Sequence, residues 1–356
     1  MARSTIPTAQ SLPLTTEATP HKGTLDGLRF LAFLAVFFFH AQPDRCPWGW
    51  AGVRVFFTLS GFLITRILIR DETGNRGADL KRFYIRRTLR IFPLYYGLIA
   101  YFWLSGSLTQ GGWLLAYLSN VKAYYAENFD AMLGHFWTLS VEEQFYLIFP
   151  PLFWVTPARF RFGLVLGLIA GSVAFQVYAH ESLKMPWAKF LSPYCMSDLA
   201  WGALAGMLEL RTRPRRFQAT ALVTLGVALL VVARWLNDRW FALPERWQIN
   251  LAPSIYGIAG ACLVFGLWRT TNPLLVWPLS FAPVAYLGRI SYGLYAFHLS
   301  VLRGMWQVEV PYAFYIPQVY RELIVTIMLA ALSWRFFEGP INRLKVRFEW
   351  LRMTQL

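Results

Sequence analysis

The chain is poor in charged residues and in cysteine. Only 15% of its 356 residues are charged and 56% are hydrophobic, whereas about 25% of a typical soluble domain is charged. The three cysteines, Cys46, Cys195 and Cys262, are far apart and lack metal-ligand spacing, so they indicate neither a disulfide framework nor a metal site. No internal repeat is evident. The composition therefore predicts a polytopic membrane protein.

Acidic residues are also scarce. The chain has 19 of them against 34 lysines and arginines, which gives a net charge of +15. Such an excess can indicate nucleic-acid binding. We exclude nucleic acid as a partner because the basic residues gather in short segments between apolar stretches, where they fix membrane orientation. With the N-terminus inside, about 21 cations fall on inner segments and about six on outer ones. This asymmetry predicts an even number of spans with both termini in the cytoplasm.

The apolar stretches are long enough to be membrane helices, since crossing about 30 Å of hydrocarbon takes roughly 20 residues. The sequence thus predicts an all-α bundle of about ten transmembrane helices. The expected spans are 28–41, 50–70, 84–105, 137–155, 162–179, 191–209, 219–236, 250–268, 283–306 and 319–338. Residues 1–24, which are polar and rich in proline and threonine, are expected to be a disordered cytoplasmic tail. Residues 25–345 form the expected membrane domain, and 346–356 a cytoplasmic C-terminal tail.

Two ionisable residues bracket the first apolar segment. Arg29 and His40 are eleven residues apart, which brings them back to within about 20° of one helix face, roughly 16 Å apart along the axis. Charged and ionisable groups on a membrane helix are costly and usually functional. The predicted orientation puts Arg29 at the cytoplasmic end and His40 towards the outer face. His40 is the candidate general base, since a neutral imidazole can take a proton from a hydroxyl; the alternative is a solvated histidine at a helix end.

Two carboxylates follow in the fourth predicted span. Glu142 and Glu143 lie in an otherwise apolar run, so each needs a partner. In the predicted topology they reach the level of His40, where one of them would orient the imidazole as the acid does in a catalytic triad. Adjacent helical residues point about 100° apart, so at most one faces His40. The alternative is that one pairs with an arginine for helix packing.

A basic cluster precedes the third span. Arg82, Arg86 and Arg90 are spaced four residues apart on one helix face, with Arg87 beside them. Arginine side chains suit phosphates, so the cluster is a candidate site for the phosphates of coenzyme A. Attraction to anionic lipid headgroups is the alternative.

Other candidates are less specific. Ser60 lies beside Gly61, and such a small pair favours close helix packing. Arg54 at this depth is expected to extend towards the surface or to pair with Glu142 or Glu143. His298, in a late span with Tyr292, is expected to be a hydrogen-bonded structural residue or, alternatively, a second base.

Several motifs, in order along the chain, resemble the acyltransferase-3 family of integral membrane O-acyltransferases. The matching segments are residues 25–40, 52–63, 82–93, 135–146, 290–298 and 337–340. Arg29 and His40 correspond to the family's paired essential positions, and Arg87 and Arg90 to its arginine-x-x-arginine. The chain departs from many members by carrying Arg54 where they have an acid, and Leu299-Ser300 where they have a proline-containing turn.

The resemblance implies a function and its partners. It implies a multi-pass protein of the bacterial inner membrane that uses acetyl-CoA or another acyl-CoA as a cytoplasmic co-substrate, with no bound cofactor and no metal. The expected activity is O-acylation, foremost O-acetylation, of a hydroxyl on a glycan, glycolipid or glycosylated metabolite reached from the outer side. The acyl group would move directly or through an acyl-histidine. The alternative function is a transporter or flippase of a lipid-linked saccharide. Membrane lipids are the other expected partners, and self-association is left open.

Overall fold

The computed structural model describes residues 21–108, 111–183, 186–212, 216–237, 245–304 and 317–344. The helices are α1 (His21–Ala41), α2 (Ala51–Arg70), α3 (Arg76–Leu104), α4 (Gly111–Leu115), α5 (Ser119–Ala126), α6 (Trp137–Val155), α7 (Arg161–Tyr178), α8 (Ser192–Arg211), α9 (Arg216–Asn237), α10 (Glu245–Arg269), α11 (Pro273–Ser280), α12 (Ala282–Arg289), α13 (Ser291–Leu302) and α14 (Gln318–Ser333). Single 3-10 or π turns are η1 (Gly134–Phe136), η2 (Ala179–Leu183), η3 (Pro186–Phe190) and η4 (Trp334–Glu338).

The all-α prediction is confirmed, because the described parts of the chain are helical and contain no strand. Each predicted span falls on a helix, but the ninth is divided at Ile290 into α12 and α13. Among the described residues, five helices are long and apolar enough to cross a membrane. They are Gly23–Ala41, Ala51–Arg70, Arg161–Ser182, Phe217–Trp235 and Gln318–Leu344. Ten crossings remain a prediction.

The predicted tails fall mostly outside the described residues. Residues 1–20 and 345–356 are not described, whereas α1 already begins at His21. The last four residues of the predicted N-terminal tail therefore belong to the first helix.

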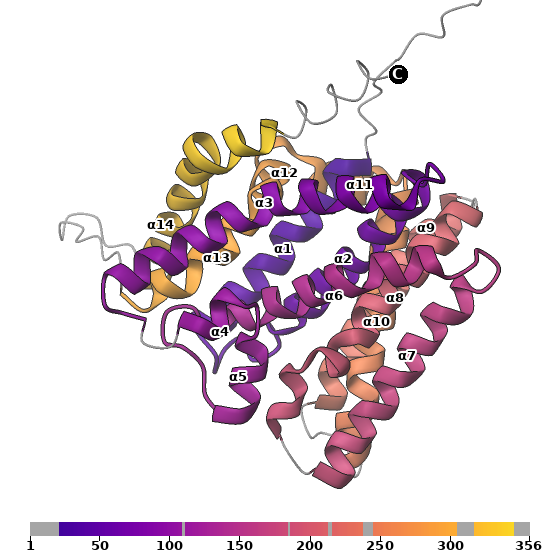
Figure 1. Cartoon of the computed structure of the whole chain (residues 1–356), viewed down its shortest axis with the longest axis horizontal. Helices are drawn as coiled ribbons and strands as arrows, with labels where there is room; N and C mark the ends of the chain where they lie inside the picture. The colour runs from indigo at the N-terminus through magenta and orange to yellow at the C-terminus, as the bar shows by residue number, and fades with distance from the viewer. Residues whose placement is uncertain are drawn as a thin grey trace, which may run out of the picture.

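Helices α1 and α2 occupy the middle of the bundle, with α3 and α6 passing in front of them in Figure 1. Helices α7 to α10 lie on one side, and α12 to α14 on the other. Close approach of α2 and α8 depends on glycine: a Cβ on Gly61 would lie 1.8 Å from the Leu199 carbonyl oxygen, and one on Gly202 would lie 2.0 Å from the Thr58 carbonyl oxygen. The small residue predicted to favour packing after Ser60 therefore does so.

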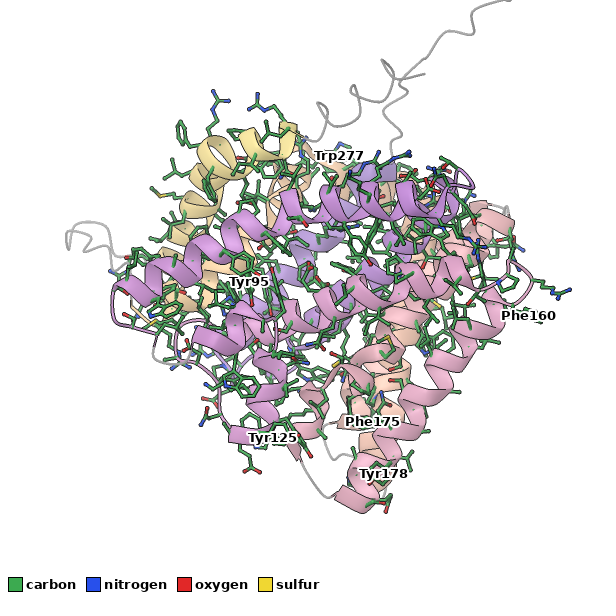
Figure 2. The ribbon with its side chains drawn as sticks, viewed as in Figure 1. Tyr95, Tyr125, Phe160, Phe175, Tyr178 and Trp277 are labelled. Carbon is green, nitrogen blue, oxygen red and sulfur yellow. The ribbon has the colours of Figure 1, made fainter. Side chains whose placement is uncertain are left out.

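The outer helices present apolar side chains outward. Only 22% of the most apolar stretch of α7 is buried, and only 17% of that of α14. Phe160 and Tyr178 are 55% and 53% exposed at the two ends of α7 and point away from the bundle in Figure 2. An apolar helix with an aromatic residue at each end matches the depth profile of a bilayer. This surface is suited to contact lipid.

Ion pairs fasten one end of the bundle. Arg161 donates two hydrogen bonds of 2.7 Å to the Glu72 carboxylate, which joins the loop after α2 to the start of α7. These bonds lower the pKa of the Glu72 carboxyl. Glu209 at the end of α8 pairs with Arg66 of α2 and with Arg269 of α10, the latter at 2.5 Å. Segments that the sequence assigns to the cytoplasmic side therefore lie together at one end of the bundle.

The opposite end is packed with aromatic rings. Phe129, in the segment before η1, packs on Phe190 of η3 with ring centroids 4.8 Å apart, and on Trp187 at 5.3 Å. Trp137 at the start of α6 packs on Phe190 at 4.9 Å. Segments predicted to be outer loops thus meet at this end.

Candidate active site

Helices α1, α2, α3, α6 and α13 enclose a cavity of about 100 Å³. Its polar lining residues are Arg29, Ser60, Arg87, Arg90, Thr138, Glu142, Tyr146, Ser291, Tyr292 and Tyr295, and its apolar lining residues are Val53, Phe56, Phe57, Leu63, Ile91 and Leu139. Five helices distant in sequence therefore bring a set of ionisable and hydroxyl side chains to one internal space.

Arginines gather at one end of this cavity. Arg29 is held by a 2.9 Å ion pair with Asp26, one turn before it on α1. The Arg87 guanidinium lies 5.1 Å from the centre of the Tyr146 ring, within the range of a cation–π contact. Arg90 is exposed, which puts it at the mouth. This end is suited to an anionic ligand.

The other two predicted arginines do not line the cavity. Arg86 pairs with Asp71 at 2.7 Å, and Arg82 lies 4.0 Å from Asp79. Both acids belong to the start of α3 or the loop before it. The spacing of Arg82, Arg86 and Arg90 predicted that all three act together. Only Arg90 lines the cavity, whereas Arg82 and Arg86 have acidic partners nearby.

Glu142 lies in the cavity, but the partners found for it are not those predicted. The Ser60 hydroxyl donates a 2.6 Å hydrogen bond to one carboxylate oxygen, and the Tyr146 hydroxyl lies 3.3 Å from the other. Tyr146 also donates to Ser60 at 3.0 Å. Glu142 lines the same cavity as Arg29. It lies seven residues after His135, which corresponds to about 10 Å along a helix axis. The predicted contact between Glu142 and His40 is not found among the described residues, because both carboxylate oxygens of Glu142 contact Ser60 or Tyr146 instead.

Glu143 does not line the cavity. Its Oε1 is buried and has no hydrogen-bond partner among the described residues. The angular separation of adjacent helical residues puts one glutamate in the cavity and the other outside it.

His40 forms part of a histidine cluster. Its Nδ1 lies 3.1 Å from the Val36 carbonyl oxygen and 3.1 Å from Nε2 of His298. The ring of His135 packs on that of His298 with centroids 4.7 Å apart. His298 and His135 are 0% and 3% exposed, whereas His40 is partly exposed. The sequence singled out His40 and His298 separately and missed both their contact and His135, which lies inside the recognised 135–146 segment.

Tyr295 separates the cavity from the histidines. Its hydroxyl lies 2.8 Å from Thr138 Oγ1 and donates to the His135 carbonyl at 3.2 Å. Its ring lies 5.2 Å from that of His298. Tyr292, one turn earlier, donates to the Ile91 carbonyl at 2.7 Å. The sequence signal for Tyr295 was its spacing three residues from Tyr292 and three from His298, which puts it within about 60° of each of them around the helix.

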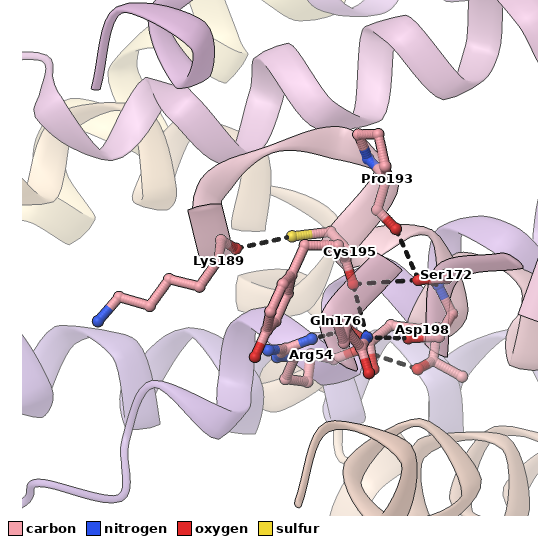
Figure 3. Close-up of polar contacts among 10 residues, drawn as sticks. Arg54, Ser172, Gln176, Lys189, Pro193, Cys195 and Asp198 are labelled. Carbon is pink, nitrogen blue, oxygen red and sulfur yellow. Dashed lines mark hydrogen bonds and ion pairs between the residues drawn. The ribbon is translucent and has the colours of Figure 1, made fainter. Parts of the chain in front are cut away.

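Arg54 has a partner that the sequence did not identify. It pairs with Asp198 of α8, as drawn in Figure 3, and lies 5.5 Å from the Trp50 ring centre and 5.9 Å from that of Tyr194. The prediction that Arg54 pairs with Glu142 or Glu143 is wrong. Asp198 is fully buried, so the pair is internal and holds α2 against α8.

A polar network next to this pair joins α7 to α8 (Figure 3). Ser172 donates to the Pro193 carbonyl at 2.7 Å, and Gln176 donates to Ser197 at 3.0 Å. The Cys195 thiol donates to the Lys189 carbonyl at 3.4 Å. These contacts secure the helices behind α2 and do not reach the cavity lining.

The fold and the cavity together define an integral membrane protein with an internal site that is cationic at one end and adjoins imidazoles at the other. A family profile described as an acyltransferase domain matches residues 23–337. The chain therefore belongs to this acyltransferase family, as its motifs indicated.

Curated relatives extend this result. The chain is 26% identical over 90% of its length to the peptidoglycan O-acetyltransferase OatA of Listeria monocytogenes. It is 27% identical over 89% of its length to a Bacillus subtilis protein named "putative peptidoglycan O-acetyltransferase YrhL". The chain covers 56% and 54% of these two relatives, so it spans about half their length. No solved structure matches the chain.

Proposed function

We propose that this protein is a membrane O-acetyltransferase that moves an acetyl group from acetyl-CoA to a hydroxyl of an envelope glycan. The observation that carries the proposal is the cavity, which has arginines at one end and, behind Tyr295, the contact between His40 and His298 at the other. Acetyl-CoA carries its negative phosphates at one end and its thioester at the other, joined by a long neutral arm. This order matches the order of arginines and histidines in the protein. The family match supports acyl transfer, and the names of the relatives support a glycan acceptor.

The donor would bind from the arginine end. Arg87 and Arg90 lie three residues apart on α3 and line the cavity together with Arg29. Their guanidinium groups would hold the phosphates of acetyl-CoA through charge-assisted hydrogen bonds. The neutral pantetheine arm would then pass Ser60 and Tyr292 towards Tyr295, with the thioester leading.

His40 would act as the general base. Its imidazole would take the proton of the acceptor hydroxyl while that oxygen attacks the thioester carbonyl. The new carbon–oxygen bond forms, the carbon–sulfur bond breaks, and the departing thiolate takes the proton from His40. Because the cavity lining stops at Tyr295, the Tyr295 ring and its bond to Thr138 must move for the thioester to reach His40.

The proposal also assigns a membrane side to each end of the bundle. The proposal puts the Glu72–Arg161 end in the cytoplasm and the aromatic end outside, with about ten crossings of a bacterial inner membrane and both chain termini in the cytoplasm. The concentration of basic residues at the first end supports this orientation. Donor and acceptor would then approach from opposite sides.

The acceptor would approach the aromatic end. Trp113 of α4 and Tyr125 of α5 are 40% and 75% exposed there, and exposed aromatic faces suit sugar rings. Peptidoglycan is the acceptor that the relatives' names suggest.

The test uses the purified full chain in detergent with acetyl-CoA labelled on the acetyl group. Free thiol and labelled glycan are measured with and without peptidoglycan fragments or a bacterial surface polysaccharide. We expect thiol release that depends on the glycan and a matching amount of labelled ester, removable by mild base. A protein that moves saccharides across a membrane but never cleaves the thioester would refute the proposal.

A further inference from the structure

We propose that His298 is the positioning residue of His40, holding the orientation of its ring through a histidine–histidine hydrogen bond and supporting, together with the Val36 carbonyl, the tautomer that a base needs. This inference rests on the proposed function, because it assigns His298 a role only if His40 acts as the base. The observation is the 3.1 Å contact between Nε2 of His298 and Nδ1 of His40, which joins α13 to the end of α1.

The carbonyl partner of His298 determines where its proton lies. Nδ1 of His298 is 2.6 Å from the Tyr295 carbonyl oxygen. A carbonyl oxygen only accepts, so Nδ1 must carry the hydrogen. In the neutral ring Nε2 then has the lone pair, and this is the atom that faces His40. His298 is fully buried, which favours the uncharged ring.

The tautomer of His40 follows from its two neighbours. Its Nδ1 lies 3.1 Å from the Val36 carbonyl oxygen and 3.1 Å from Nε2 of His298. Both neighbours are acceptors and share the single N–H of Nδ1, so Nδ1 of His40 carries the hydrogen and Nε2 carries the lone pair. The free lone pair is the one that a general base needs, and it lies on the ring nitrogen that makes neither contact.

This arrangement assigns to a neutral histidine the task that an aspartate performs in a catalytic triad. The acceptor on Nδ1–H holds the imidazole in one tautomer and one orientation. Glu142, which the sequence suggested for this role, bonds to Ser60 and Tyr146 instead. The rings of Phe33 and His135 pack on His298 with centroids 6.0 and 4.7 Å away, so the positioning ring is itself held in place.

Two amide substitutions separate positioning from packing. In His298→Asn the amide N–H can replace Nδ1 and bond the Tyr295 carbonyl, but the side chain is too short to reach His40. In His298→Gln the longer amide places its oxygen near the former Nε2 position, where it can accept from His40 Nδ1–H. His180→Asn makes the same chemical change on η2, outside the cluster.

The experiment measures kcat and the KM for acetyl-CoA with the purified full chain, and the melting temperature of each variant. We expect His298→Asn to lower kcat about 10- to 100-fold, by analogy with the loss that follows removal of the orienting partner of a metal-bound histidine. KM should change less than about twofold, and His298→Gln should recover most of the loss. His180→Asn should match the wild type.

Four outcomes are informative. Equal kcat for the wild type and His298→Asn overturns the positioning role, and so does an equal loss in the Asn and Gln variants at unchanged melting temperature. If His298→Asn does not fold, His298→Leu is used in its place. A kcat of His298→Leu equal to that of His298→Gln then overturns the positioning role. Wild-type activity of His40→Ala would instead refute the proposed function itself, whatever the His298 variants do.

Discussion

The Ser60 hydroxyl donates a 2.6 Å hydrogen bond to Glu142, and the Tyr146 hydroxyl lies within 3.3 Å of both groups. This contact crosses from α2 to α6 in the part of the cavity that also holds the arginines. It places Glu142 with the cavity arginines and leaves the histidine cluster without a carboxylate partner among its described contacts.

Removing the Glu142 side chain should destabilise the protein. Glu142→Ala leaves the Ser60 and Tyr146 hydroxyls without their acceptor, at a cost of about 1–3 kcal/mol in the free energy of unfolding. Glu142→Gln keeps an acceptor oxygen and should lose less. The matched control is Glu143→Gln, since Glu143 Oε1 has no described partner. Thermal unfolding in detergent measures all three, and equal losses at positions 142 and 143 would contradict the assignment.

The cavity arginines should control donor affinity. Arg87→Gln or Arg90→Gln removes a charge-assisted hydrogen bond to phosphate, typically about 1.5–3 kcal/mol, and should raise the KM for acetyl-CoA roughly 10-fold or more. Arg86→Gln is the matched control, because Arg86 pairs with Asp71 and does not line the cavity. Steady-state kinetics provides the comparison. Donor binding elsewhere is indicated if Arg86→Gln raises KM as much as Arg87→Gln.

Breaking the internal pair of α2 and α8 should be costly. Asp198→Ala leaves the buried Arg54 guanidinium uncompensated, which typically costs about 3–5 kcal/mol. The double variant Arg54→Met with Asp198→Leu buries no lone charge and should be more stable than Asp198→Ala alone. Melting temperatures test this order. The reverse order would show that Arg54 does not depend on Asp198.

The Glu72–Arg161 contact should make stability depend on pH. Its two hydrogen bonds lower the pKa of Glu72 below its ordinary value of 4.5. A lowered carboxyl pKa in the folded state stabilises the protein fully above the ordinary pKa, and this stabilisation is lost as the pH falls through the lowered value. The melting temperature of the wild type should therefore exceed that of Glu72→Gln at pH 7, and the difference should shrink below about pH 4.5. A difference that grows in acid would contradict the pairing.

Local patterns in the sequence were sufficient for the helices and for part of the site. Apolar segments predicted where the helices lie, and the spacing of Arg29 and His40 singled out one residue of the cavity and one of the histidine cluster. Helical geometry also predicted that Glu142 and Glu143 point in different directions, and only Glu142 lines the cavity. These features depend on residues within one helix, where geometry is known in advance.

Contacts between distant helices could not be predicted in the same way. Asp198 is 144 residues from Arg54, and His298 is 258 residues from His40. Nothing in either segment indicates the other, because side-chain partners depend on how helices rotate and cross. The partner of Glu142 was missed for the same reason. The sequence suggested His40, whereas the Glu142 carboxylate contacts Ser60 of α2 and Tyr146 of α6.

The most direct test of the account is the acetyl-transfer rate of purified His40→Ala, measured together with its affinity for coenzyme A. A general base typically contributes about 10²- to 10⁴-fold to the rate. We predict that transfer to the glycan falls by at least about 100-fold while the dissociation constant of coenzyme A stays within about twofold of wild type, because the cavity arginines are intact. Transfer at the wild-type rate would contradict the account.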